Sequence, residues 1–156
     1  MFKGFRWEVW VSALCSFVAT LAIAATDTRA LLDEAYQDEL KAYIRYEGII
    51  EQFGEVSPFV NLVEAERRHL DHLADLYIAR GMTPASVSEP AAVMYLSVTA
   101  ACQVSLEAEK DNVVVLDRLM KESVDTDIKD TLKWIRDASA ERHIPALERC
   151  SASPAS

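Results

Sequence analysis

Apolar residues recur every three or four positions along four stretches of this chain, a spacing that places them on one face of an α-helix. The stretches predict helices over residues 27–53, 58–80, from within 90–98 to about 122, and 126–150. A cap residue, a proline or a glycine stands at most of these boundaries. The apolar stripes are Leu32, Ala35, Ala42, Tyr46, Ile49 and Phe53; Phe59, Leu62, Leu73 and Leu76; Val98, Cys102, Ser105, Leu116 and Leu119; and Ile128, Leu132, Ile135, Ser139, Ala146 and Cys150.

The links between these stretches predict how the helices pack. The first and last links are short, whereas residues 82–90 form a longer polar link with two prolines. Short links join antiparallel neighbours, and a longer one lets the chain cross the end of a bundle. We therefore expect an all-α fold, an antiparallel four-helix bundle with a longer crossover between the second and third helices. Four glycines and five prolines in 156 residues also argue against an all-β sandwich, which needs frequent turns.

The N-terminal segment has the order of a secretory signal. Two basic residues precede an uncharged apolar run that ends in Ala22-Ile23-Ala24, an A-x-A cleavage pattern. Because the run is long for a signal, an uncleaved membrane anchor is the alternative. We expect the mature protein in the periplasm or outside the cell, with a signal peptide over residues 1–25, the bundle over 26–150 and a flexible tail over 151–156.

The net charge of −9 bears on the choice of partner. The chain has no basic patch that could hold phosphates, so we do not expect it to bind nucleic acid. An acidic surface of mixed sign favours solubility and a mild attraction for cations.

Polar residues interrupt every apolar stripe at positions that should face the core. They are three glutamates and two histidines, Glu39, Glu66, His69, Glu109 and His143. A buried carboxylate is costly unless it is paired or bound to a cation. One such residue would suit a salt bridge, but five on four helices predict one metal centre in the middle of the bundle. Without metal, at least one of the crowded carboxyls should be protonated near neutral pH.

Short motifs around these residues resemble the ferritin-like di-iron carboxylate proteins. Glu66-Arg67-Arg68-His69 is a Glu-x-x-His pair on one helix face, and residues 39–46 are similar to the Glu-x-x-Ala-x-x-x-Tyr of rubrerythrin-like members. The resemblance is to short secreted bacterial proteins of unassigned function. It spans residues 31–150 and includes Asp38-Glu39, Phe53-Gly54, Pro58-Phe59, Glu64-Ala65-Glu66, Glu107-Ala108-Glu109-Lys110, Ala138-Ser139, and His143 with Pro145 and Cys150.

The resemblance implies a role for each of the five polar residues. Glu66 and His69 would bind the same ion, since residues three apart on a helix lie side by side. Glu109 would be a bridging or terminal ligand with Glu39 as its counterpart, and His143 would supply the second imidazole. Tyr46 and Asn112 are candidates for hydrogen bonds to these ligands.

One position departs from the family pattern. The fourth helix should carry a glutamate three residues before His143, but Ala140 stands there, and only Asp137 or Glu141 could substitute. The departure means either an open coordination position or a degenerate site. Other candidates fall off the stripes and are expected on the surface, namely His72, Glu64, Glu107 and Glu47, the last of which a simple hairpin register would favour over Glu39.

Two cysteines are placed to pair near this centre. Cys102 is seven residues before Glu109, and Cys150 is seven after His143. Seven residues are close to two helical turns, so in antiparallel helices both cysteines reach the same level, about 10 Å from the metal. We expect a disulfide, which an oxidising compartment permits.

Carboxylate and imidazole ligands suit iron, with manganese as the alternative. The resemblance implies one or two irons per chain and oxidation of Fe(II) or reduction of oxygen or peroxide. The chain has no CxxC pair that could form a rubredoxin-like electron donor. Two other functions stay open: a non-enzymatic binding or interaction module with a degenerate site, and a copper or zinc binder that uses His69, His72 and His143. Substrate, reductant and oligomeric state are left open.

Overall fold

The computed structural model describes the backbone of residues 11–84 and 93–153, and the side chains of residues 28–84 and 93–153. The predicted leader, residues 1–25, lies outside the described side chains, and its first ten residues lie outside the described backbone. Most of the predicted link over residues 82–90 and the end of the predicted tail are also outside the described part. Within that part, no helix has both the length and the apolar character needed to cross a membrane.

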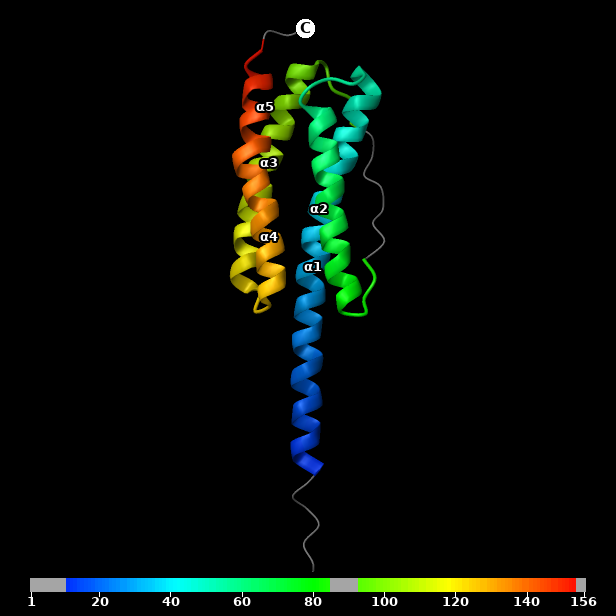
Figure 1. Ribbon diagram of the computed structural model, residues 1–156, viewed down its shortest axis with the longest axis vertical. Coiled ribbons are helices and arrows are strands. Elements are labelled where there is room, and N and C mark those ends of the chain that lie inside the picture. The colour runs from blue at the N-terminus through cyan, green and yellow to red at the C-terminus, as the bar shows by residue number, and fades with distance from the viewer. Residues whose placement is uncertain (1–10, 85–92, 154–156) are drawn as a thin grey trace, which may run out of the picture.

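The described chain is a bundle of helices with no strand (Figure 1). The predicted fourth helix is continuous but contains one π-helical turn, which divides it into three elements. The first part of α1 extends beyond the other helices at one end of the bundle. The elements are α1 Val11–Phe53, α2 Phe59–Ala79, α3 Val98–Glu122, α4 Thr126–Ala138, the π-helix η1 Ser139–His143 and α5 Ile144–Ser151.

Most predicted helix boundaries agree with the structure. Gly54 and Gly81, which follow α1 and α2, have φ of +83° and +65°, a conformation that L side chains rarely adopt. At the start of α3 the Ser97 hydroxyl accepts a hydrogen bond of 3.1 Å from the Ala100 amide. The predicted start of the first helix at residue 27 is wrong, because α1 begins at Val11. Nothing in the alanine-rich stretch before residue 27 breaks a helix.

The π-helical turn changes which residues of the last helix face the core. Pro145 has no amide hydrogen to donate to the carbonyl four residues earlier, and η1 lies immediately before it. A wider turn lets residues spaced by four stay on one face, so Ile135, Ser139, His143 and Leu147 are all buried. The prediction that Ala146 continues the buried stripe is therefore wrong, since Leu147 takes that place.

The core has two apolar layers with a polar layer between them. One apolar cluster includes Leu32, Leu73, Leu116 and Ile135. The other includes Tyr46, Phe59, Cys102 and Leu147. On each helix the polar interruption lies between residues of the two clusters, which gives the polar side chains a dry environment. The residues of that middle layer are Glu39, Glu66, His69, Ser105, Glu109, Asn112, Ser139 and His143.

Candidate metal centre

All five glutamates and histidines that interrupt the stripes converge in the middle layer. Their side chains come from α1, α2, α3 and η1, and each residue is 3% exposed or less. Burial on this scale removes the water that would otherwise solvate three carboxylates. The groups must therefore be satisfied by one another, by protons or by a cation.

The first group of possible ligands consists of Glu39, Glu66 and His69. The Nδ1 atom of His69 lies 2.8 Å from Glu39 Oε2 and 2.9 Å from Glu66 Oε2. One ligand atom from each residue lies within 4.8 Å of the others, a spacing that allows one ion to contact all three. The Glu-x-x-His pair thus points both of its side chains at one place, as the sequence predicts.

The second group consists of Glu66, Glu109 and His143. The Nδ1 atom of His143 lies 3.1 Å from Glu66 Oε1 and 3.3 Å from Glu109 Oε2. Glu66 belongs to both groups and turns one carboxylate oxygen toward each histidine. Glu109 belongs to the second group alone, so its geometry is that of a terminal ligand and the shared position belongs to Glu66.

Several buried atoms of the second group have no hydrogen-bond partner. These atoms are Glu66 Oε1, Glu109 Oε2 and His143 Nδ1. These atoms are close enough for ion pairs but are not aligned for hydrogen bonds. A buried polar atom without a hydrogen-bond partner costs free energy, so another interaction is expected to satisfy them. Two carboxylate oxygens and an imidazole nitrogen are donors that a cation can use once His143 gives up its proton, so this donor set fits a metal ion.

A second set of hydrogen bonds holds the ligand carboxylates in place. The Tyr46 hydroxyl donates to Glu109 Oε1 at 2.5 Å, and the Asn112 amide donates to Glu39 Oε1 at 2.9 Å. Asn112 also donates to Asp38 at 3.0 Å and accepts from the Ser139 hydroxyl at 3.3 Å. Both residues expected to contact the ligands do so. Ser139 was not predicted in this role, although a hydroxyl four residues before His143 on a core stripe was a usable signal.

The electrostatics of the metal-free centre follow from burial and from the carboxylate–imidazole pairs. Burial, then the charge of Glu66, raises the pKa of Glu39 to about 8. Burial opposes ionisation of Glu66 as well, but its contacts with His143 and His69 outweigh burial and hold its pKa below the ordinary range. Glu39 is therefore the carboxyl that stays protonated near neutral pH, first because it is buried and second because Glu66 is charged.

The two histidines carry the balancing positive charge. Burial lowers the pKa values of both histidines, but the adjacent carboxylates outweigh burial and raise the pKa to about 9 for His69 and about 10 for His143. Burial, then the charge of Glu109, raises the pKa of the Tyr46 hydroxyl, which therefore stays protonated and donates its hydrogen bond. Without metal the centre is held together by protons on these groups.

The structure places the remaining candidates outside the centre. Glu47, Glu64, Glu107 and His72 are exposed. Glu47 bonds with Tyr43, while Glu64 and Glu107 form salt bridges with neighbouring basic residues on their own helices. The choice of Glu39 over Glu47 therefore agrees with the packing, because the link from residue 54 to 58 offsets α2 relative to α1.

No carboxylate replaces the glutamate expected at Ala140. Asp137 forms salt bridges with Lys133 and Arg136, and Glu141 is exposed. Neither residue belongs to a group of possible metal ligands. Among the described residues, the two groups of possible ligands therefore contain three glutamates and two histidines, and η1 contributes only His143 to them.

One aromatic contact was missed by sequence reasoning. Trp134 is 39% exposed, and its ring lies edge-on at 5.0 Å from the ring of His69 and 4.6 Å from that of His72. Helical periodicity shows which face of a helix a residue occupies, but it does not show which side chains of a neighbouring helix that residue will contact.

The fold and the site together define an all-helical bundle with a buried glutamate–histidine group able to hold metal. No protein-family model, curated protein or solved structure matches this chain.

Proposed function

We propose that this protein is a metalloprotein of the ferritin-like kind, an antiparallel bundle with a crossover between α2 and α3, which binds two iron ions between its buried carboxylates. The observation that carries the proposal is Glu66. Its two oxygens face two different histidines, and each side is completed by one further glutamate. A shared carboxylate between two ligand groups is the arrangement expected of a dinuclear site.

Each residue of the buried centre has a definite part in this proposed function. Glu39 and His69 would hold one ion, Glu109 and His143 the other, and Glu66 both. Tyr46 and Asn112 fix the orientation of the terminal carboxylates by hydrogen bonds. The two apolar layers exclude bulk water from the centre.

The donor set argues for iron or manganese over softer metals. Oxygen and imidazole ligands without thiolate suit Fe(II) and Mn(II). A bound iron pair would supply redox chemistry toward oxygen or peroxide, so we propose a ferroxidase-like or peroxidase-like oxidoreductase.

Metal stoichiometry tests the proposal directly. Chelator-treated protein is titrated with Fe(II) in the absence of oxygen, and separate samples are titrated with Mn(II), Zn(II) or Cu(II). The bound metal per chain is measured in each sample. We expect two Fe(II) per chain, one for each ligand group. Glu66→Ala should abolish both, whereas Glu39→Ala and Glu109→Ala should each lose one. The matched control is Glu64→Ala, because Glu64 is exposed and lies on the same helix as Glu66, and this variant should bind as much metal as the wild type.

A second candidate function is a non-enzymatic binding module with a degenerate centre. Ala140 favours it, because the η1 side offers no fourth carboxylate. One ion per chain, or none, with no Fe(II) oxidation in air would support this candidate. Higher occupancy by zinc or copper would instead support the histidine-based site, although exposed His72 belongs to neither ligand group.

We also propose that the protein acts in the periplasm or outside the cell. The A-x-A pattern at the end of the apolar run supports cleavage, which would leave Ala25 or Thr26 as the first residue. N-terminal sequencing of the native protein tests this. An intact Met1 in a membrane fraction would indicate the anchor.

A further inference from the structure

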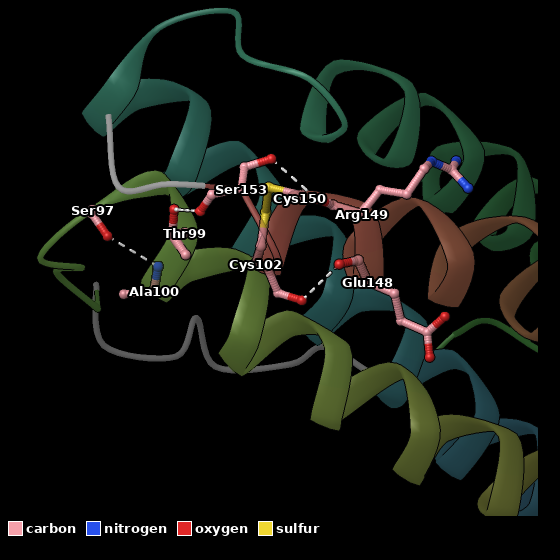
Figure 2. Close-up of a disulfide and its surroundings, with 9 residues drawn as sticks. Ser97, Thr99, Ala100, Cys102, Glu148, Arg149, Cys150 and Ser153 are labelled. Carbon is pink, nitrogen blue, oxygen red and sulfur yellow. Dashed lines mark hydrogen bonds between the residues drawn. A yellow bond between two sulfur atoms is a disulfide. The ribbon is translucent and has the colours of Figure 1, made fainter.

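A cavity of about 360 Å³ lies beside the Cys102–Cys150 disulfide, at the end of the bundle away from the N-terminal part of α1. It lies between the α1–α2 link, the start of α3 and α5, and its lining includes Ser57, Thr99, Arg149, Cys150 and Ser153. Figure 2 shows Thr99 and Ser153 next to the bond between the two sulfurs. At about 30 Å³ per water molecule, the cavity has room for a small organic molecule.

The two cysteines of this disulfide differ in their access to solvent. Cys150 lines the cavity and is half-buried, whereas Cys102 is completely buried in the apolar cluster with Ala101 and Leu147. A thiolate that opens a disulfide must approach one sulfur directly, and access decides which sulfur it attacks. The cavity therefore directs attack to Cys150.

The charge beside the cavity is positive. Arg149 is the one charged residue among the described residues that line it. Its side chain extends from α5 away from the disulfide (Figure 2). A thiol with a carboxylate some distance from its sulfur could therefore meet Cys150 and Arg149 at once, and a cationic thiol would be repelled.

We propose that this cavity is a reaction site for small anionic thiols, which open the Cys102–Cys150 disulfide by attack on Cys150. The incoming thiolate forms a mixed disulfide with Cys150 as the Cys102–Cys150 bond breaks. The electron pair leaves on the Cys102 sulfur, which takes a proton because its surroundings are apolar. A second thiolate attacks the mixed disulfide, releases the oxidised thiol and leaves Cys150 reduced. In total two thiols are oxidised and the protein gains two electrons.

The inference goes beyond the proposed function and requires no metal, so each can fail without the other. The test uses metal-free full-length protein with Cys15→Ser, which leaves only the disulfide pair. Folded protein is incubated with reduced glutathione or with cysteamine, an anionic and a cationic thiol, at several concentrations and matched thiolate content. Iodoacetamide stops the reaction, and peptide mapping locates the mixed disulfide.

We expect reduction of the folded protein at a rate proportional to thiol concentration, with the glutathione adduct on Cys150. Glutathione should react about two- to fivefold faster than cysteamine, the size expected for attraction between exposed charges. Arg149→Gln should remove this preference, and Arg142→Gln, an exposed arginine in η1, should keep it.

Three outcomes would overturn the proposal. An adduct on Cys102 would show that access does not favour Cys150. A rate independent of thiol concentration would show that reduction waits for unfolding. An unchanged preference in Arg149→Gln would show that the cavity does not select charge.

Discussion

Replacing Glu39 with glutamine should stabilise the metal-free protein while it weakens metal binding. In the folded protein Glu39 is fully buried, and its pKa of about 8 keeps it protonated at pH 7. In the unfolded chain the same group ionises near 4.5. The wild-type protein must therefore take up a proton on folding at neutral pH, whereas glutamine is neutral in both states and keeps an oxygen that can accept from Asn112.

The size of the effect follows from the linkage between protonation and folding. When folding raises the pKa of a carboxyl group, the free energy of unfolding falls as the pH rises from the pKa of the unfolded chain to the pKa of the folded protein. The slope is at most about 1.4 kcal/mol per pH unit. Between pH 4.5 and 7, Glu39 should remove about 3 kcal/mol from the stability of the metal-free protein. The Glu39→Gln variant should keep most of that stability.

Urea unfolding of chelator-treated protein between pH 4.5 and 8 measures this difference. Below pH 6.5 the histidines are protonated in both states, so a slope between pH 4.5 and 6.5 belongs mainly to Glu39. We expect wild type and the control Glu64→Gln to lose stability in this window and Glu39→Gln to stay nearly level. With Fe(II) present the order should reverse, since an amide is a poorer ligand than a carboxylate. A variant less stable than wild type at pH 7 without metal would refute the reasoning.

Three further predictions follow from other parts of the structure. Replacing Cys102 and Cys150 together by serine should lower the free energy of unfolding by about 4 kcal/mol in urea melts, because the bond joins residues 48 positions apart in the sequence; a loss below about 1 kcal/mol would contradict that. Tyr46→Phe leaves Glu109 without its donor and should weaken metal affinity about tenfold in an Fe(II) titration, and an unchanged affinity would count against the positioning role. Iron binding should quench the tryptophan fluorescence of the wild-type protein, because the ring of Trp134 lies 5.0 Å from that of His69. This quenching should be lost in Trp134→Phe, and equal quenching in the variant would place the metal elsewhere.

Much of the fold could be predicted because a bundle is specified by local signals. The three-and-four spacing places Leu32, Leu73, Leu116 and Ile135 on inward faces, and the structure packs them in one cluster. The π-helical turn could not be predicted in this way. It arises from competition between backbone hydrogen bonding near Pro145 and the packing of Leu147, and a fixed helical period does not represent that competition.

The composition of the centre could be predicted, but the sharing of ligands could not. A charged residue on a core stripe is visible in sequence, so Glu39, Glu66 and Glu109 stand out. Which carboxylate lies between the two histidines depends on how far α2 is offset from α3 and η1. That offset is set by the link at residues 54–58 and by the longer chain before α3, whose lengths limit the register without defining it.

Protonation explains how such a polar layer can lie in a dry core. Protons on His69, His143 and Glu39 offset the charge of the ionised carboxylates, so the metal-free group is held by imidazole–carboxylate pairs instead of repelling itself. The same lone pairs are the ones a cation would use, so metal and protons compete for one set of atoms. We expect a bound cation to replace these protons without rebuilding the layer, because Tyr46 and Asn112 already orient Glu109 and Glu39. The contacts that hold the carboxylates in place without a cation would therefore also hold them in place for one.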